Sequence, residues 1–380
     1  MQLSENHQII RDIARRFTEE KIIPIAAEID VEGRFPEDNM RALGEMGFLG
    51  VMVPEEYGGA GMDTVSYALV IEEIARGCGS HALGVAAHNS LGCMPLLWFG
   101  SEEQKKKYLP RAASGEMFVS YGLTEPGAGS DAGGTKTTAV LDGDQWVING
   151  SKSWITNANY AGLFVLTALT DPEKGTRGGI TAFLVERDTP GFSVGKKEDK
   201  LGMRGSDTAQ LLMEDVRVPK DAMLGDLGQG FKQFMKVLDG GRISIAALAL
   251  GIAEGAHDYS VNYAKDREAF GKAITQFQAI QWMIADAAME IEASRHMIME
   301  SARLKDAGEP FGHLSAMAKL FASEVAMRVT NNAMQILGGY GYCADYPVER
   351  MYRDAKLCTI GEGTSEILRI VISRHAFDNS

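Results

Sequence analysis

A single carboxylate, Glu362, stands between Gly361 and Gly363 in the segment "CTIGEGTSEILR" near the end of the sequence. A carboxylate on bare backbone can approach a ligand closely and accept a proton from it. The same pattern is also typical of an ordinary surface turn. Thr364 and Ser365 follow as candidate caps of an apolar helix that would anchor the carboxylate. The chain has no H-E-x-x-H motif and no Ser-His-Asp signature, so we expect any catalytic base to be a carboxylate.

A second candidate segment, "LTEPGAGSDAGG" at residues 123–134, is rich in glycine and hydroxyl side chains. It is not a P-loop, because no G-x-x-x-x-G-K-[ST] occurs in the chain, and no helix is expected after it, as a dinucleotide-binding fingerprint requires. The segment is either an ordinary loop or a cradle whose backbone a flat ligand can approach. In the second case Thr124 and Ser130 would offer hydroxyl groups to that ligand.

Trp154 stands beside Thr156 in "KSWITNA", within a stretch rich in β-forming residues. A tryptophan in such a stretch usually belongs to the core. It can also form a wall for a planar aromatic cofactor, with Thr156 as a polar contact. The residue types alone leave both interpretations open.

Two segments of the C-terminal third carry further candidates. Arg267 is expected at a helix end and Gln278 near the start of the next helix. An arginine there is most often a partner of the helix dipole or of a surface acid, but its planar fork also suits a phosphate. The segment "QILGGYGY" at 335–342 is either a plain helix C-cap or a further part of the same ligand site.

Three zones of different periodicity must position these residues. Residues 1–117 are expected to form amphipathic helices. Residues 118–228 contain short β-branched runs and a hairpin signal at Asp142–Gly143, which predicts a small antiparallel barrel or sandwich. Residues 229–380 contain long helical segments joined by short loops, which predicts a helical bundle. The longest helices are expected at about 230–266, 277–307 and 312–337.

Composition limits the class of protein. The 380 residues are 45% apolar, enough for a large core, and the net charge of −13 argues against nucleic acid as the main partner. The most apolar window, 81–100, is interrupted by polar residues and by proline, so no membrane span is predicted. The four cysteines form no C-x-x-C pair and are expected to be buried, reduced thiols. The acidic N-terminal stretch is unlike a transit peptide, so we expect a cytoplasmic protein, or a mitochondrial matrix protein if the chain is processed.

Seven segments, taken together and in this order, resemble the acyl-CoA dehydrogenases, and most closely their short-chain branch. They are "YGLTEPGAGSDAGG", "WVINGSKSWITNA", "GKKEDKLGMRGSDTAQLLMEDVRVPKD", "LDGGRISIAALALGIA", "DREAFGKAITQFQAIQ", "QILGGYGY" and "GEGTSEI". The resemblance covers essentially the whole chain. It implies a mainly α protein with an N-terminal helical domain (1–117), a middle antiparallel β-barrel (118–228) and a C-terminal four-helix bundle (229–380).

The resemblance also implies FAD, bound without a Rossmann fold between barrel and bundle. One set of residues would contact the FAD of the same chain: Tyr121, Leu123, Thr124, Gly129, Ser130, Trp154, Ile155 and Thr156. A second set would reach the FAD of a neighbouring subunit: Arg267, Phe270, Gln278, Gln335, Gly338 and Gly339. Thr364 and Glu366 are expected to contact the cofactor as well. The flavin site would be complete only in a dimer, and the family is usually a homotetramer built as a dimer of dimers.

The reaction that the resemblance implies is α,β-dehydrogenation of an acyl-CoA thioester to the trans-2-enoyl-CoA. Glu362 would accept the α-proton, while the β-hydrogen leaves as hydride to the flavin. The backbone N–H of Glu362 would also help to stabilise the thioester oxygen. Some members carry the base on the long helix that begins the bundle, but the matching residue here is Gly241, which supports Glu362. The residues expected to contact substrate are Ser130, Asp239, Arg242, Gly361 and Gly363, and electrons would pass to an electron-transferring flavoprotein.

Position 361 departs from the pattern of the straight-chain members, which usually have a tyrosine there. The isovaleryl branch also has glycine at this position, so the sequence predicts a short-chain substrate, straight or short-branched. A 2-methyl-branched or cyclic carboxyl-CoA stays open as the alternative. A non-catalytic assembly protein on the same fold is a more distant one.

Overall fold

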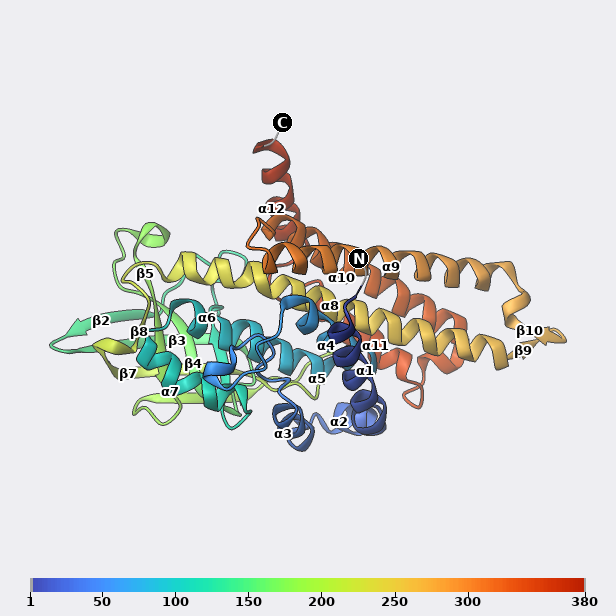
Figure 1. The fold of residues 1–380 in the computed structure, drawn as a ribbon, viewed down its shortest axis with the longest axis horizontal. Helices are drawn as coiled ribbons and strands as arrows, with labels where there is room; N and C mark the ends of the chain where they lie inside the picture. Colours follow the sequence, from blue (N-terminus) through green and yellow to red (C-terminus); the bar gives the residue numbers. More distant parts are fainter. Residues whose placement is uncertain (1–2, 379–380) are drawn as a thin grey trace.

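The computed structural model describes residues 3–378. In the order of the sequence, helices come first, the strands of a large β-sheet follow, and long helices come last (Figure 1). The sheet lies at one end of the long axis. A two-stranded hairpin, β9 (Glu268–Ala269) with β10 (Lys272–Ala273), lies at the other end. Long helices run between the two ends, and they determine how far apart the candidate site residues lie.

The N-terminal helices pack against the long helices rather than forming a separate body. The central helix of this region, α4 (Thr64–Gly77), is buried along almost its whole length and contacts both α8 (Gly230–Asp266) and α9 (Gln278–Asp306). An ion pair between the buried Glu72 and the half-buried Arg295, at 2.9 Å, joins α4 to α9. The other helices here are α1 (Glu5–Phe17), α2 (Ala26–Glu32), α3 (Glu37–Glu45), α5 (Gly79–Ala86), α6 (Met94–Phe99) and α7 (Glu102–Ala113).

The described residues form an eight-stranded sheet in the order β6-β7-β3-β2-β4-β5-β8, with β1 paired to β4. The predicted hairpin at Asp142–Gly143 is confirmed, since Asp142 pairs with Gln145 and Gly143 has φ +64°. The strands are β1 (Phe118–Gly122), β2 (Thr138–Asp142), β3 (Gln145–Thr156), β4 (Ala161–Leu169), β5 (Ile180–Glu186), β6 (Phe192–Lys197), β7 (Thr208–Pro219) and β8 (Met223–Leu224).

The barrel is not confirmed, because the strand pairings within residues 3–378 leave the sheet open at β6 and β8. The prediction of a purely antiparallel sheet is wrong. Strand β1 runs parallel to β4, and Thr138 of β2 also pairs in parallel with Leu169 of β4. Parallel strand partners are joined by long connections, so turn residues, which indicate a hairpin, give no signal of a parallel pairing.

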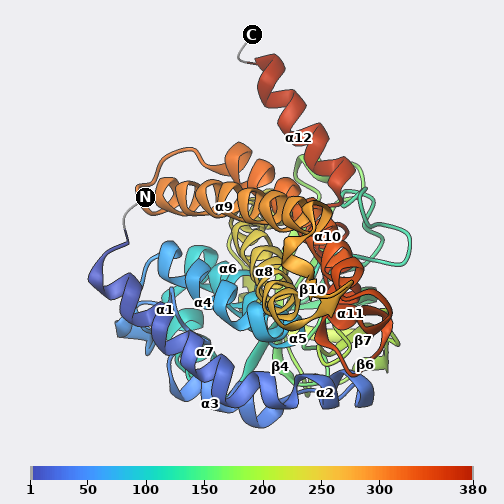
Figure 2. The ribbon, with the colours of Figure 1, turned by 90° about the vertical axis from the view of Figure 1, so that its right-hand side faces the viewer.

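The C-terminal helices follow the predicted periods closely. Helix α8 has 37 residues, and α10 (Gly312–Leu337) packs against α8, α9 and α11 (Pro347–Cys358). Helix α12 (Ser365–Asp378) projects away from the body of the molecule, as both views show (Figures 1 and 2). The domain boundaries near 117 and 228 remain predictions.

The cysteine prediction holds in part. Cys78, Cys93 and Cys358 are buried and free, but Cys343 is exposed, because it follows the surface turn of η8 (Gly338–Tyr342) after α10. No helix within residues 3–378 is both long and apolar enough to cross a membrane.

Candidate active site

Glu362 lies in the short loop between α11 and α12 with a left-handed backbone, φ +54°. This conformation costs a residue with a Cβ about 1–3 kcal/mol, so the surroundings must hold it. Gly363 follows at φ +102°, a region that favours glycine. Gly361 has no such φ, and a Cβ there would lie in ordinary contact with Leu357, 3.7–3.9 Å away. Glycine is therefore needed for its conformation at 363, whereas at 361 it leaves room.

The carboxylate of Glu362 packs against bare backbone of α8. Its Oε2 atom is buried and has no hydrogen-bond partner among the described residues. A Cβ built on Gly241 would lie 2.2 Å from this oxygen and 3.3 Å from Leu91. Gly241 therefore does not only lack a basic group. The absence of a side chain at this position also leaves the space that the Glu362 carboxylate occupies. An unpaired buried oxygen in such a site is suited to accept a proton from a ligand.

The surroundings bring the pKa of Glu362 close to neutral. Burial raises the pKa to about 7, against the attraction of Lys319 and Arg242, which favours the charged form. Burial outweighs both cations, so the net shift of this pKa is upward. A base with a pKa near the working pH is well matched to proton abstraction.

Arg242 and Asp239 form an ion pair on α8 beside this base, with Arg242 Nη1 donating to Asp239 Oδ1 at 2.5 Å. Arg242 is buried, and its Nε has no partner within residues 3–378. Burial raises the pKa of Asp239, while Arg242 opposes that shift. The contact of Asp239 and Arg242 with substrate stays a prediction.

The glycine-rich segment is shaped by a residue that the sequence analysis missed, Glu125. Its carboxylate accepts hydrogen bonds from Thr135 Oγ1, Lys136 N at 2.6 Å, Thr137 N at 3.1 Å and Lys152 Nζ at 2.8 Å. Burial alone would raise the pKa of Glu125, but Lys152 and these donors lower it to about 2.

Lys152 is fully buried, and its Nζ also donates to Leu123 O at 3.3 Å. Ser153 N donates to Thr124 O at 2.8 Å. The two predicted flavin segments, 123–134 and 152–158, are therefore joined through Lys152 and its neighbour. The only sequence signals were two charged residues, Glu125 in the glycine-rich segment and Lys152 in the β-rich stretch, and charge alone does not show burial.

The exposed groups of these segments fit a flat ligand. Trp154 is 60% exposed and has φ +63°, so the ring is not part of the core. A Cβ on Gly129 would meet nothing within 4 Å, which leaves the backbone open to close approach. Ser130 is exposed, whereas Ile155 is buried in the core and has only backbone to offer. Tyr121 stacks on Phe234 of α8, with ring centroids 4.1 Å apart.

The other residues predicted to contact the cofactor of the same chain differ in exposure. Thr124, Leu123 and Thr156 are half-buried. Thr364 caps α12, because its Oγ1 accepts a hydrogen bond from Ile367 N at 3.3 Å. Glu366 is exposed in the first turn of that helix, where its own backbone and Thr364 lower its pKa. Their contacts with a cofactor stay predictions.

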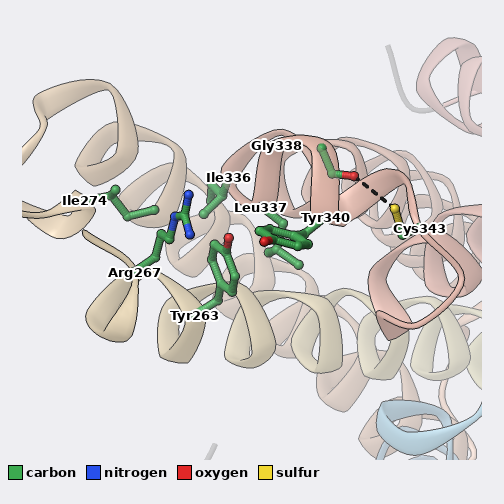
Figure 3. Close-up of a pocket in the computed structure, with 9 residues that line it drawn as sticks. Tyr263, Arg267, Ile274, Ile336, Leu337, Gly338, Tyr340 and Cys343 are labelled. Carbon is green, nitrogen blue, oxygen red and sulfur yellow. Dashed lines mark hydrogen bonds between the residues drawn. The ribbon is translucent and has the colours of Figure 1, made fainter. Parts of the chain in front are cut away.

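The second predicted group lies at the far end of α8. Arg267 is the C-cap residue of α8 and lines a pocket of about 430 Å³ together with Gly338, Gly339 and Tyr340 (Figure 3). Its guanidinium carbon lies 5.7 Å from the centre of the Tyr340 ring. Phe270 is 96% exposed with φ +54°. Gln278 and Gln335 are exposed near this pocket but do not line it.

The two groups cannot meet in one chain. Tyr121 OH donates to Phe234 O at 3.1 Å near the start of α8, and Arg267 follows the end of that helix. The distance along the helix axis from position 234 to the C-cap at position 267 is about 50 Å at 1.5 Å per residue. A single dinucleotide does not bridge that separation, so both groups can contact the same cofactor only if a second copy supplies one of them.

The fold and the site together define a class of mainly helical protein with a buried, unpartnered carboxylate, and comparison with known proteins identifies the family. Family models match at residues 4–116 (acyl-CoA dehydrogenase, N-terminal domain), 120–216 (middle domain) and 228–377 (C-terminal domain). The chain belongs to the acyl-CoA dehydrogenase family, which confirms the resemblance seen in its motifs. Acyl-CoA dehydrogenases are FAD-dependent oxidoreductases.

Individual relatives cover nearly the whole chain. The chain is 49% identical to the short-chain specific acyl-CoA dehydrogenase of Clostridium acetobutylicum, over 99% of both chains. Among solved structures, butyryl-CoA dehydrogenase from Megasphaera elsdenii superposes with a TM-score of 0.97 at 44% identity, again over 99% of both chains. A chain from a study of the electron transferring flavoprotein of Acidaminococcus fermentans gives a TM-score of 0.98 at 48% identity, over 99% of both chains.

Proposed function

We propose that the protein dehydrogenates a short-chain acyl-CoA between its α and β carbons, with Glu362 as the base. The observation that carries the proposal is the buried, unpartnered Oε2 of Glu362, whose pKa is raised to about 7. Oε2 accepts the α-proton of the thioester, and the electron pair of that C–H bond forms the new double bond. Bound FAD supplies the acceptor for the β-hydrogen, which leaves with its electron pair.

The thioester oxygen would bind beside the same loop. The backbone N–H of Glu362 has no acceptor within the described part of the chain, so it is free to donate to this oxygen. Such a donor stabilises the negative charge that develops on the oxygen as the proton leaves. Gly361 leaves space beside the reacting carbons. Asp239 and Arg242 would then hold the CoA portion from α8.

Relatives whose names specify short-chain or butyryl substrates support a short straight thioester. They do not favour the 2-methyl-branched or cyclic alternative. The unpartnered carboxylate of Glu362 and the exposed groups of the two predicted flavin segments also argue against a non-catalytic assembly protein.

Anaerobic titration tests the proposal. The purified protein should be yellow, and butyryl-CoA should bleach its oxidised-flavin absorbance in the absence of oxygen. Glu362→Gln is the matched control: it should keep FAD and bind butyryl-CoA, yet lose reduction by about two to four orders of magnitude. A protein that takes up no added FAD would refute the enzyme function, and normal bleaching by Glu362→Gln would show that another residue is the base.

The oligomer and the electron acceptor are part of the same proposal. The predicted cofactor residues around Arg267 and those around Trp154 lie at opposite ends of α8. We therefore infer that two copies pair to complete each flavin site, in a dimer of dimers. Sedimentation of the FAD-loaded protein should give a tetramer, and a monomer with tightly bound FAD would refute this. An electron-transferring flavoprotein is the proposed acceptor, which the likeness to a chain from a study of such a protein supports. Its reduction should require the dehydrogenase and butyryl-CoA together.

A further inference from the structure

Helix α10 holds both ends of the loop that carries Glu362. Ser323 Oγ donates to Cys358 O at 2.8 Å, at the start of the loop. Lys319 Nζ donates to Gly363 O at 2.5 Å, directly after Glu362. Positions 319 and 323 are four residues apart on one helix and therefore lie on the same face. The two bonds grip the loop from one side.

Lys319 is an unusual residue for this position. It is fully buried, and within residues 3–378 the Gly363 carbonyl is the only hydrogen-bond acceptor of its Nζ, which has three donors. Burying an ammonium costs free energy unless it is paired, so a purely structural position would be better filled by an apolar residue. Burial lowers the pKa of Lys319 to about 8, which still leaves most of it charged at pH 7.

Several titratable groups face this ammonium and the base. The pKa of Lys319 is raised by Cys358 of α11, by Glu362 of the α11–α12 loop and by Glu366 of α12, and it is lowered by Arg242 of α8. Tyr67 of α4 and Tyr121 of β1 face Glu362, and both phenols have raised pKa values, mainly through burial. Lys319 and Arg242 are therefore the two cations that act on Glu362.

We propose that Lys319 is a positioning residue for the catalytic base: through the Gly363 carbonyl it keeps Glu362 in its left-handed conformation, with Oε2 against Gly241. The inference rests on the proposed function, since it takes Glu362 to be the base. Ser323 secures the other end of the loop. The strained φ of Glu362 explains why these two hydrogen bonds are needed, because a loop that relaxed from this conformation would turn the carboxylate away from the substrate.

The test compares Lys319→Met with Lys305→Met in the FAD-loaded protein. Lys305 is the matched control: it is half-buried, burial also lowers its pKa to about 8, and its Nζ donates to Thr64 Oγ1 of α4 and not to the loop that carries Glu362. Two quantities are measured: the rate of flavin reduction by butyryl-CoA, and the titration of the Glu362 carboxyl by difference infrared spectroscopy, assigned with Glu362→Gln. The second does not depend on turnover.

Lys319→Met should keep FAD, reduce about 10²-fold more slowly, as expected when a catalytic group is displaced by about 1 Å, and titrate Glu362 at higher pH than wild type. Lys305→Met should match wild type in both. Ser323→Ala, which removes one hydroxyl and no charge, should slow reduction without moving the titration.

Wild-type rate and titration in folded Lys319→Met would overturn the inference, as would equal changes in Lys305→Met. If Lys319→Met does not fold, a wild-type rate in Ser323→Ala overturns it. If wild type itself is not bleached by any short acyl-CoA, the proposed function has failed and the inference falls with it.

Discussion

Gly241 of α8 and Glu362 of the α11–α12 loop share one space: a Cβ on Gly241 would lie 2.2 Å from Glu362 Oε2. We therefore expect Gly241→Ala to push the carboxylate out of place and to lower the rate of flavin reduction by about 10²-fold while FAD stays bound. The adjacent Gly240→Ala is the control, because its Cβ would lie 3.6 Å from Lys305 and Trp98, an ordinary contact. Gly240→Ala should reduce normally and gain up to about 1 kcal/mol of helix stability. Equal rates in the two variants would contradict this account.

The rate of flavin reduction should depend on pH through Glu362. Only the carboxylate can accept the α-proton, and burial raises the pKa of this group to about 7. The rate should thus be low at pH 6, rise through pH 7 and level off above pH 8. Stopped-flow reduction at constant ionic strength measures this, and a rate independent of pH between 6 and 8 would speak against a base with this pKa.

The buried pair of Glu125 and Lys152 should determine whether the flavin segments keep their shape. Removing one partner of such a pair typically costs about 3–5 kcal/mol, so Glu125→Gln should be strongly destabilised in urea and retain less FAD. Glu186→Gln is the matched control in the same sheet: its partner Lys107 is 2.7 Å away, but both side chains are more than half exposed. That change should cost at most about 1 kcal/mol.

Acid should act on the same pair. The pKa of Glu125 is lowered to about 2 in the folded chain, against an ordinary value of 4.5. A lowered carboxyl pKa stabilises the fold above about pH 4.5, and this contribution is lost as the pH falls toward 2. The difference in unfolding free energy between wild type and Glu125→Gln should therefore shrink between pH 5 and pH 2. A constant difference over that range would show that the charge of Glu125 is not what stabilises the segment.

Arg267→Ala should weaken FAD binding, although Arg267 lies about 50 Å along α8 from Phe234, the residue that Tyr121 contacts. FAD content after gel filtration should fall, and the melting temperature should fall with it, because a ligand bound only to the native state stabilises it. Excess FAD should recover most of the loss. Arg303→Ala, at the end of α9 and paired with Glu300 of the same helix, is the control and should retain FAD. Unchanged FAD content in Arg267→Ala would argue against a site shared between two copies.

Position 361 should influence which acyl groups fit. A tyrosine there would fill the space that Gly361 leaves, and one methyl in a pocket is worth about 1–3 kcal/mol. Gly361→Tyr should thus raise the ratio of kcat/KM for butyryl-CoA over isobutyryl-CoA by about 10- to 200-fold. Gly361→Ala should impair both substrates less than Gly363→Ala, because only Gly363 has a positive φ. An unchanged ratio in Gly361→Tyr would exclude this position as a determinant of substrate shape.

Local sequence signals were sufficient for much of the fold. The long helices at 230–266, 278–306 and 312–337, the Asp142–Gly143 hairpin and the loop that ends at the Thr364 cap all follow from periodicity, turn residues and capping side chains. These features depend on residues within a few positions of one another, so the sequence displays them directly. The ordered motifs likewise sufficed to recognise the family and to single out Glu362.

What the sequence could not show are contacts between residues far apart in the chain. Four such contacts join separate elements: the parallel pairing of β1 with β4, the buried ion pair of Glu125 with Lys152, the hydrogen bond from Lys319 to Gly363, and the packing of Glu362 against Gly241. Buried charges look like surface charges in a sequence, because only packing removes them from water. The sequence by itself determined which residue is the candidate base; the tertiary structure decided its backbone conformation, its raised pKa and the neighbours that hold it, since all three arise from desolvation and contact across the folded chain.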